Sequence, residues 1–422
     1  MTDITHPLEA PTAAPDASLE LARSAANAAA GARNLTVGYL RAFITLLVLA
    51  HHAVIAYIPG LPKPPAVFGQ PPFTWGAFPV EDAAHPFAPF GLLTGVNEAF
   101  FMSLMFLISG LFVWDSLKRK GAAGFVRDRV VRLGLPFAVA ATILAPLAYY
   151  PAYRLTGAAP GVGAFARAWI SLGSWPAGPA WFIWVLLAFG CLAAALYRLA
   201  PKWGETIGRL FAAGGERRAL PTFAKLLLAS GVAYTAFALL FGPAEWLAFG
   251  PFSVQAARIL HYGVYFACGV GIGALGLERG LISASGVLAR RWWAWALAAP
   301  LAFALSAVLG IAAFFAPGRA PIGLQAGADV AYALACATIS FALLAAFARF
   351  VRRRSRVWDS LSANAYGMYL VHYVFVSWLQ YALLPASMPG LAKGVLVFVG
   401  VVALSWTITA AMRRIPAVRR VV

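Results

Sequence analysis

The chain has 422 residues, of which 61% are hydrophobic and only 11% are charged. Soluble domains carry roughly 25% charged residues, so this composition excludes a soluble globular protein and is typical of an integral membrane protein. The formal net charge of +18 does not indicate nucleic-acid binding. Its basic residues stand in short clusters between apolar runs, as in the cytosolic loops of membrane proteins.

Residues 1–36 are polar, rich in Ala and Pro, and partly acidic. They lack the basic start and apolar core of a signal peptide, so we expect a disordered cytosolic tail. The three cysteines, Cys191, Cys268 and Cys336, each lie in an apolar segment without the spacing of metal ligands. We interpret them as free packing residues and predict no metal site.

A membrane-spanning helix needs about 20 mostly apolar residues. Ten segments fit this rule: residues 37–58, 92–114, 133–152, 179–198, 224–248, 254–277, 292–316, 327–349, 362–385 and 391–412. A short Gly-rich stretch near 160–175 is interpreted as a re-entrant or interfacial piece. The predicted fold class is all-α, a polytopic integral membrane protein with about ten transmembrane helices. One transmembrane domain covers residues 37–412, and residues 413–422 form a basic cytosolic tail.

The distribution of Lys and Arg predicts the orientation of these helices. The stretches after the second, fourth, sixth, eighth and tenth segments, with the N-terminal tail, hold 26 of the 33 basic residues. The opposite face has Lys63, Arg154, Arg167, Arg319 and Lys393. Because cytosolic loops are enriched in Lys and Arg, both termini are expected in the cytosol. The loop 59–91 then faces outward.

The first segment carries side chains that resist leaving water. Arg41 lies near its cytosolic end, and His52 follows eleven residues later. Eleven steps of about 100° bring the two within about 20° of the same helix face, about 16 Å apart along the axis. Arg41 is either an anchor at the membrane surface or part of a site. His52 is the candidate functional imidazole, whereas His51 points roughly a quarter turn away and is expected to pack.

The second segment, "GLLTGVNEAFFMSLMFLISGLFVW", starts on the outer face and carries Glu98 about two turns in. The rise per residue places Glu98 and His52 at similar depths, roughly the outer third of the bilayer. A carboxylate at that depth is costly unless it is paired, and a histidine is its natural partner. Such a pair can orient a general base. The alternative is a structural hydrogen bond between helices.

The cytosolic loop after this segment ends in "FVRDRVVRLGLP". Arg129 and Arg132 lie one turn apart and share a helix face, with Arg127 beside them. Cytosolic loops are rich in arginine in any case. The functional alternative is a phosphate site, since guanidinium groups form forked hydrogen bonds with phosphate oxygens.

Later segments also carry polar groups. Arg258 and His261, three residues apart, can share a helix face near the outer side. His372 lies near the middle of the ninth segment, with Tyr369 one turn before it.

These features match a known family. The chain resembles the acyltransferase-3 family of integral membrane acyltransferases, and within it the branch around the glucan biosynthesis protein C, from about residue 37 to 412. Arg41 and His52 match the family's Arg-x10-His spacing, and Arg129 and Arg132 match its Arg-x-x-Arg motif. The stretches "NEAFFMSLMFLISGLFVWDSLKRKG", "GPAWFIWVLLAF" and "SANAYGMYLVHYVFVSWLQY" are similar to its second-helix, mid-chain and late blocks.

The resemblance implies an enzyme that takes an acyl group, acetyl or succinyl, from cytosolic acyl-CoA and transfers it to a hydroxyl of a glycan or another cell-envelope acceptor. His52 is then expected to be the general base or a transient acyl carrier, oriented by Glu98, while Arg41 stabilises developing negative charge or a coenzyme phosphate. Arg127, Arg129 and Arg132 are expected to bind the coenzyme. The residues expected to bind substrate are Trp181, Arg258, His261, Tyr369 and His372. Acyl-CoA is expected as a donor substrate, with no tightly bound cofactor.

The alternative function is a multi-pass transporter or flippase for sugar-lipids or exported metabolites, which would also bury charges among about ten helices. The absence of a visible inverted repeat weighs against it. The composition, rich in Ala, Gly and Arg, indicates a GC-rich bacterium, so we expect the cytoplasmic (inner) membrane. The expected partners are acyl-CoA, a hydroxyl acceptor and membrane lipid, without nucleic acid.

Overall fold

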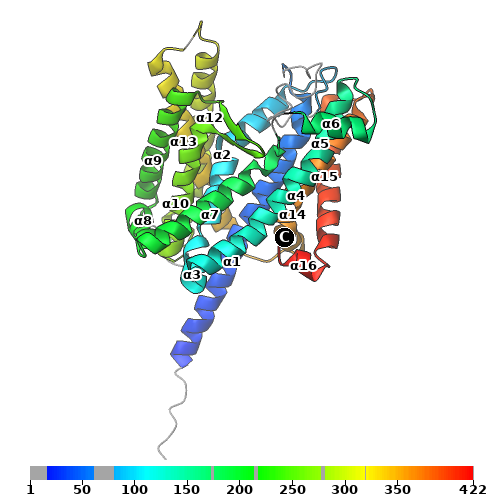
Figure 1. The fold of residues 1–422 in the computed structure, drawn as a ribbon. Coiled ribbons are helices and arrows are strands. Elements are labelled where there is room, and N and C mark those ends of the chain that lie inside the picture. Colours follow the sequence, from blue (N-terminus) through cyan, green and yellow to red (C-terminus); the bar gives the residue numbers. More distant parts are fainter. Residues whose placement is uncertain are drawn as a thin grey trace, which may run out of the picture.

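The computed structural model describes residues 17–60, 80–172, 175–212, 217–276, 281–318 and 320–421. These residues form a bundle of long helices whose axes are roughly aligned (Figure 1). The N-terminal part of α1 (Ala17–Val54) and the short helix α16 (Pro416–Arg419) lie at its lower end. This architecture confirms the prediction of a mainly helical protein.

Eight stretches of the described chain are long and apolar enough to cross a membrane. They are the end of α1 with η1 (Leu35–Tyr57), α2 (Pro89–Gly110), the path from α3 to α5 (Val113–Leu155), η4 with α7 (Gly178–Leu199), α9 (Ala219–Phe241), α12 (Trp292–Phe314), α13 (Ile322–Phe350) and α15 (Gly390–Met412). The chain is therefore a multi-pass membrane protein.

Two other predicted segments are helices that do not meet the same criterion. α10 (Ile259–Ala274) has only 16 residues. α14 (Arg356–Leu383) has 28 residues, but buried polar side chains, including His372 and Gln380, interrupt its apolar sequence. Both lie inside the bundle, where α10 packs on α2 and α8 (Trp203–Ala212), and α14 packs on α1, α5 and α15.

The remaining elements complete the description of the chain. They are η1 (Ile55–Tyr57), α3 (Val113–Arg129), η2 (Val130–Gly134), α4 (Leu135–Val139), η3 (Ala140–Leu144), α5 (Ala145–Leu155), α6 (Val162–Ile170), η4 (Gly178–Ala180), α7 (Trp181–Leu199), η5 (Ala256–Arg258) and α11 (Val287–Arg290). The stretch near 160–175 that was expected to be re-entrant or interfacial contains α6, which packs against α5.

The structure differs from the prediction at the start of the first helix. α1 begins at Ala17, so residues 17–36 are helical here rather than a disordered tail, while residues 1–16 lie outside the described part. Ala, Leu and Arg, which have high helix propensity, dominate "ASLELARSAANAAAGAR".

The second difference is a hairpin of two antiparallel strands, β1 (Trp246–Phe249) and β2 (Phe252–Gln255), in an otherwise helical fold. The segment 224–248 was expected to continue as helix, but α9 ends at Phe241 because Gly242 and Pro243 follow. Gly250 has a φ of 56°, which a two-residue hairpin turn requires at its first central position. The Trp184 indole donates to the Ser253 carbonyl at 2.9 Å and fastens the hairpin to α7.

Prolines shape the path from α3 to α5. Pro136 has no N–H, so the Arg132 carbonyl lacks its α-helical donor, and the Tyr366 hydroxyl of α14 donates to it at 2.7 Å. Pro151 has the same effect on the Leu147 carbonyl, to which the Trp378 indole donates at 2.9 Å. Because lipid offers no hydrogen bonds, each such carbonyl needs a protein partner. Side chains of α14 thus fix this segment, including the π-helical turn η2 that carries Arg132.

Helices α2 and α10 approach at backbone distance. A Cβ atom at Gly269 would overlap the carbonyl of Leu107, and one at Gly273 would overlap that of Leu111. Small residues allow such contacts between helices in membranes, where dispersion replaces the hydrophobic effect as the main attraction. α10 therefore holds α2, with Glu98, in a fixed position.

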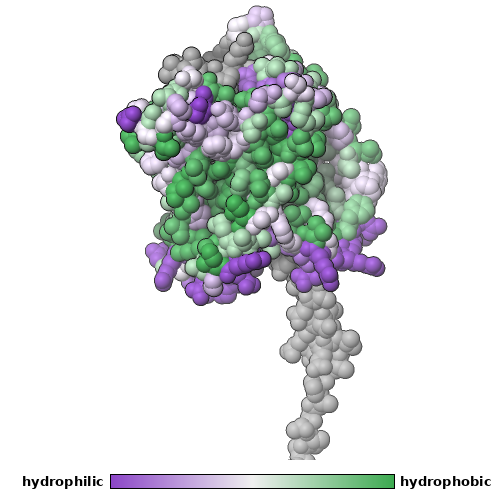
Figure 2. Space-filling view, turned by 90° about the vertical axis from the view of Figure 1, so that its right-hand side faces the viewer, coloured by the Kyte–Doolittle hydropathy of each residue, from purple (hydrophilic) through white to green (hydrophobic). Residues whose placement is uncertain are grey.

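The surface fits a bilayer. On the face that Figure 2 shows, hydrophobic residues cover the middle of the molecule and hydrophilic ones line its lower edge. α12 exposes Leu297, Leu301 and Val308 to 63%, 72% and 64%. An exposed apolar face of this extent is stable in contact with lipid and unfavourable in water.

Candidate active site

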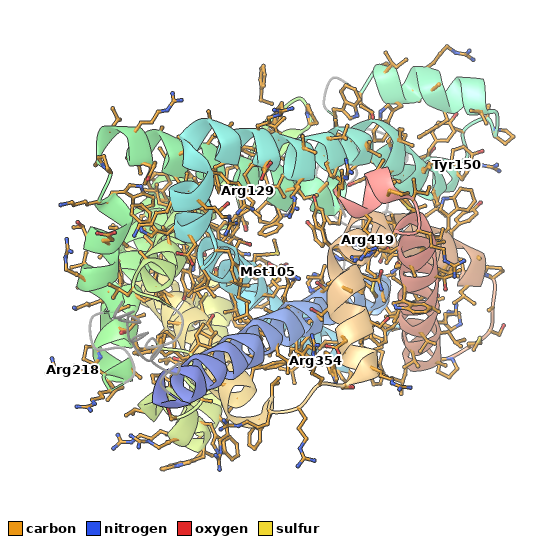
Figure 3. The ribbon with its side chains drawn as sticks, turned by 90° about the horizontal axis from the view of Figure 1, so that it is seen from below. Met105, Arg129, Tyr150, Arg218, Arg354 and Arg419 are labelled. Carbon is orange, nitrogen blue, oxygen red and sulfur yellow. The ribbon has the colours of Figure 1, made fainter. Side chains whose placement is uncertain are left out.

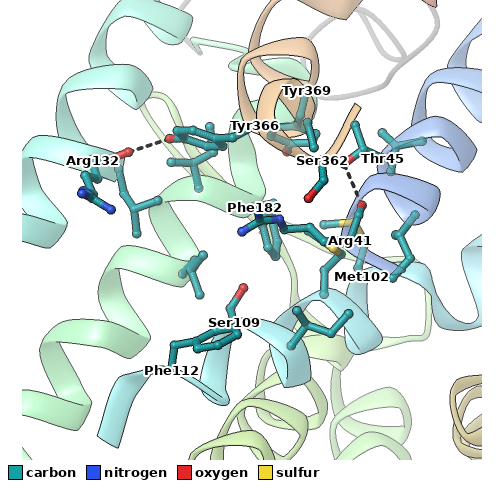
Figure 4. Close-up of a pocket in the computed structure, with 18 of the residues that line it drawn as sticks. Arg41, Thr45, Met102, Ser109, Phe112, Arg132, Phe182, Ser362, Tyr366 and Tyr369 are labelled. Carbon is teal, nitrogen blue, oxygen red and sulfur yellow. Dashed lines mark hydrogen bonds between the residues drawn. The ribbon is translucent and has the colours of Figure 1, made fainter. Parts of the chain in front are cut away.

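A cavity of about 390 Å³, here called the lower cavity, opens toward the end of the bundle at which α16 lies. Arg41 from α1, Arg129 from α3 and Arg132 from η2 line it. Figure 4 shows Arg41, Ser109, Phe182, Tyr366 and Tyr369 converging on this space from different helices.

These three arginines, with Arg413, which also lines the space, give the lower cavity a positive charge. In the described part of the chain, none of them forms an ion pair with a carboxylate. The Arg129 guanidinium carbon lies 4.9 Å from the Phe125 ring centroid, which orients it. Arg127 is exposed and does not line the cavity, so the predicted coenzyme set is brought together only in part.

A second cavity of about 220 Å³, the upper cavity, lies on the other side of the bundle core. His51, His52, Glu98, Trp181 and Arg258 line it. Val48, Met102 and Tyr369 line both cavities, so the two cavities lie next to each other. The two ends of the predicted Arg41–His52 face therefore reach different cavities.

Glu98 contacts different partners from the predicted one. Its Oε2 lies 2.8 Å from Arg258 Nη1, and its Oε1 lies 3.6 Å from His51 Nε2. His52, expected to pair with this carboxylate, faces α14 instead. Arg258 also lies 5.2 Å from the Tyr332 ring centroid, so an aromatic face stabilises the cation of this pair. His51, expected to be a packing residue, thus belongs to a charged cluster at the cavity.

His52 and His372 form a hydrogen-bonded chain. His372 Nδ1 lies 2.6 Å from the Tyr369 carbonyl, and His372 Nε2 lies 3.2 Å from His52 Nδ1, which is 3.0 Å from the Val48 carbonyl. Carbonyls only accept, so both Nδ1 atoms carry the proton in the neutral rings. His52 Nδ1–H is then shared between Val48 and His372, and His52 Nε2 keeps a free lone pair. This arrangement assigns His52 the tautomer of a general base.

Gln380 binds the backbone of α1 at His52. Its amide nitrogen donates to the carbonyls of His52 and Ala53 at 2.9 and 3.1 Å. These carbonyls lie in the last turn of α1, where the helix supplies no donor. Gln380 is buried, and its amide fixes the end of α1 beside the upper cavity.

The other predicted substrate residues divide into two groups. Trp181 lines the upper cavity, with its ring 5.8 Å from Tyr262 and 5.9 Å from Trp246 of β1. Tyr369 lines both cavities, and its hydroxyl donates to the Pro179 carbonyl. His261 and His372 are fully buried and line neither cavity.

Sequence reasoning missed several residues of the site. Trp246 and Gln255 of the hairpin line the upper cavity, and Tyr366 lines the lower one. The Phe-Gly-Pro-Phe turn between short alternating stretches was a usable hairpin signal. The spacing of Pro136 from Arg132 signalled a carbonyl in need of a donor, but not which side chain supplies it.

Neither the curated protein sequences nor the solved structures contain a match to the chain. A family model described as an acyltransferase domain, that of the acyltransferase-3 family, matches residues 34–410. This span includes the arginines and histidines that line the two cavities, except Arg413. The chain belongs to the acyltransferase-3 family and is a membrane acyltransferase.

Proposed function

We propose that the protein transfers an acyl group from acyl-CoA, bound in the lower cavity, to a hydroxyl of an acceptor in the upper cavity. The observation that carries this proposal is the pair of cavities that share Val48, Met102 and Tyr369. One is positively charged, and the other has an imidazole beside the shared wall. A thioester carbonyl that passes this wall would meet His52.

The orientation supports a donor from the cytosol. The lower cavity lies at the end of the bundle whose edge is hydrophilic in Figure 2, and Arg41, Arg129, Arg132 and Arg413 line it. The positive-inside rule places this end in the cytosol. We therefore propose ten membrane-spanning helices, the eight above with α10 and α14, and both termini in the cytosol of a bacterial cell, within its cytoplasmic membrane.

Arg41, Arg129 and Arg132 would bind the coenzyme diphosphate. Guanidinium groups form charge-assisted, forked hydrogen bonds with phosphate oxygens, and three of them without a carboxylate partner among the described residues favour a multiply charged anion. Arg41 lies about 16 Å along α1 from His52 by helical rise. At that distance it acts on the phosphates rather than on an oxyanion beside His52.

His52 would act as the general base. Its Nε2 takes the proton of the acceptor hydroxyl as the oxygen attacks the thioester carbonyl, so that a C–O bond forms. The C–S bond then breaks, and the proton passes from His52 to the departing thiolate, which gives free CoA. His372 would orient the ring and stabilise its protonated form through Nε2.

The upper cavity supports a polar, ring-containing acceptor. Trp181 and Trp246 present aromatic faces, and Glu98 and Gln255 present hydrogen-bond acceptors and donors. Aromatic faces with few polar groups are typical of small-molecule sites. A glycan hydroxyl fits this lining, and the resemblance to the glucan biosynthesis protein C branch makes acetyl and succinyl the first acyl groups to test.

The test uses purified protein with [acyl-¹⁴C]acetyl-CoA or succinyl-CoA and a cell-envelope glycan extract, with thiol release and labelled product both measured. His52→Gln should bind acyl-CoA normally and lose transfer by about 10²–10⁴-fold. His51→Gln is the matched control, since its ring is adjacent but outside the His372 chain. Equal loss in the two variants, or a wild-type rate unchanged from pH 8 to pH 5, would overturn His52 as base. Wild-type protein that binds no acyl-CoA would overturn the donor site.

A further inference from the structure

A second hollow, the basic hollow, lies at the same end of the bundle as the lower cavity, with a volume of about 770 Å³. It lies between α14, α15 and α16 and the π-helical turn η2. Its lining residues are Arg132, Asn364, Ala410, Arg413, Arg414, Pro416, Arg419 and Arg420.

The basic hollow continues into the lower cavity. Arg132 and Arg413 line both spaces, and Val421 lines the lower cavity. Arg413 donates through Nη1 to the Ala363 carbonyl on α14, which holds its guanidinium at the junction. In the view from below, Arg419 lies beside the part of the molecule where Arg129 and Met105 of the lower cavity are found (Figure 3).

The arginines here converge, which the positive-inside rule does not require. Five of the eight lining residues are Arg, and no acidic side chain lines the hollow within the described part of the chain. By contrast, Arg354 on the same face points toward the Asp359 carboxylate at 3.7 Å, and Arg352 donates to the Arg349 carbonyl. Converging cations repel one another, so an anion with several charges would stabilise this arrangement.

We propose that the basic hollow binds the phosphorylated ribose end of the acyl-CoA donor, through its 3′-phosphate monoester. This inference rests on the proposed donor in the lower cavity. CoA carries a diphosphate and a separate 3′-phosphate, and a phosphate monoester has a charge of about −1.5 to −2 at neutral pH. The smaller lower cavity takes the acyl-pantetheine arm, Arg41, Arg129 and Arg132 bind the diphosphate together with Arg413 at the junction, and the larger hollow takes the nucleotide with Arg419 and Arg420 at its phosphate.

The experiment compares CoA with 3′-dephospho-CoA by equilibrium binding to the full-length protein in a neutral detergent. Arg419→Gln/Arg420→Gln is the test variant. Arg353→Gln/Arg356→Gln is its control, because it removes the same charge from exposed positions on the same face that line neither space. The test variant should weaken CoA by about tenfold or more, through loss of charge-assisted hydrogen bonds, and leave 3′-dephospho-CoA unchanged. The control should change neither.

Each other outcome overturns the proposal in a distinct way. If the test variant lowers the affinity for both ligands equally, or behaves like the control, the basic hollow does not bind the 3′-phosphate. An anionic lipid headgroup offers the same phosphate chemistry. In that case, native mass spectrometry from nanodiscs with phosphatidylglycerol would show less bound lipid on the test variant than on wild type. The test variant would still prefer CoA to 3′-dephospho-CoA as wild type does. Wild-type protein that binds neither coenzyme refutes the proposed function itself, whereas binding that depends on Arg132 but not on Arg419 and Arg420 refutes only this inference.

Discussion

The buried ion pair between Lys393 and Asp82 is expected to stabilise the segment 80–88. Lys393, in the first turn of α15, is 0% exposed, and its ammonium nitrogen is 2.6 Å from Asp82 Oδ2. His85 Nδ1 lies 3.1 Å from the same nitrogen. Removing one partner of a buried pair costs about 3–5 kcal/mol, because the other charge stays buried without compensation. Lys393→Met should lower the free energy for opening the outer segment 80–88 by about that amount.

Hydrogen–deuterium exchange measures this opening directly. The Phe87 N–H donates to the Tyr57 carbonyl at 2.8 Å and exchanges only when the segment opens. A loss of 3–5 kcal/mol corresponds to exchange about 10²–10⁴-fold faster. Lys202→Met, at an exposed position, is the matched control and should leave the rate unchanged. Asp82→Leu/Lys393→Met should recover most of the loss, since apolar replacement of a buried pair is often neutral.

The contribution of this ion pair to stability depends on pH. Burial pushes the pKa of Asp82 up, but the hydrogen bonds and charges of Lys393 and His85 outweigh it and hold the pKa below its ordinary value. A carboxyl group with a lowered pKa stabilises the folded state above its unfolded pKa of about 4 and loses that contribution as pH falls through the folded pKa. The difference between wild type and Lys393→Met should therefore shrink below about pH 4. A single variant as protected as wild type at pH 7, or a difference that grows toward low pH, would refute this reasoning.

Three further predictions concern the helices around the cavities. Tyr366→Phe leaves the Arg132 carbonyl without its donor, so it should cost about 1–3 kcal/mol and lower the thermal midpoint in detergent; an unchanged midpoint would contradict the proline argument. Glu98→Gln should keep acyl-CoA affinity and slow acyl transfer, measured by labelled product, whereas weaker donor binding would contradict its place in the upper cavity. Gly269→Ala should cost more than about 1–3 kcal/mol by overlap with backbone, whereas Gly323→Ala, in open space on α13, should not lower the midpoint.

The lengths of the apolar runs were enough to predict most of the helices. Each of the ten predicted segments overlaps a helix, because a bilayer requires about 20 apolar residues and saturated backbone hydrogen bonds. The ends were less predictable. Gly242 stops α9 seven residues before the predicted end at 248, and helix propensity extends α1 to Ala17. Both outcomes follow from local chemistry that a length rule ignores.

The partners within the site could not be predicted from spacing alone. Helical periodicity placed Arg41 and His52 on one helix face, and in the structure each lines a different cavity. The expected partner of Glu98 was His52, but the histidine near its carboxylate is His51. Which histidine meets the carboxylate depends on how α1 and α2 rotate about their axes. The close contact of α2 with α10, through Gly269, sets that rotation, and it lies far from Glu98 in sequence.

The polar side chains of α1 face two cavities rather than lipid. A charged side chain facing lipid at the bilayer centre costs several kcal/mol, but Arg41 faces the lower cavity and His52 the upper one. Between them, Val48, Met102 and Tyr369 line both cavities, so the two spaces lie next to each other in the bundle. Under the proposed function, a thioester in the lower cavity would lie beside the space that holds the imidazole of His52. The cavities that make these charges tolerable inside the membrane are thus also the spaces proposed for the donor and the acceptor.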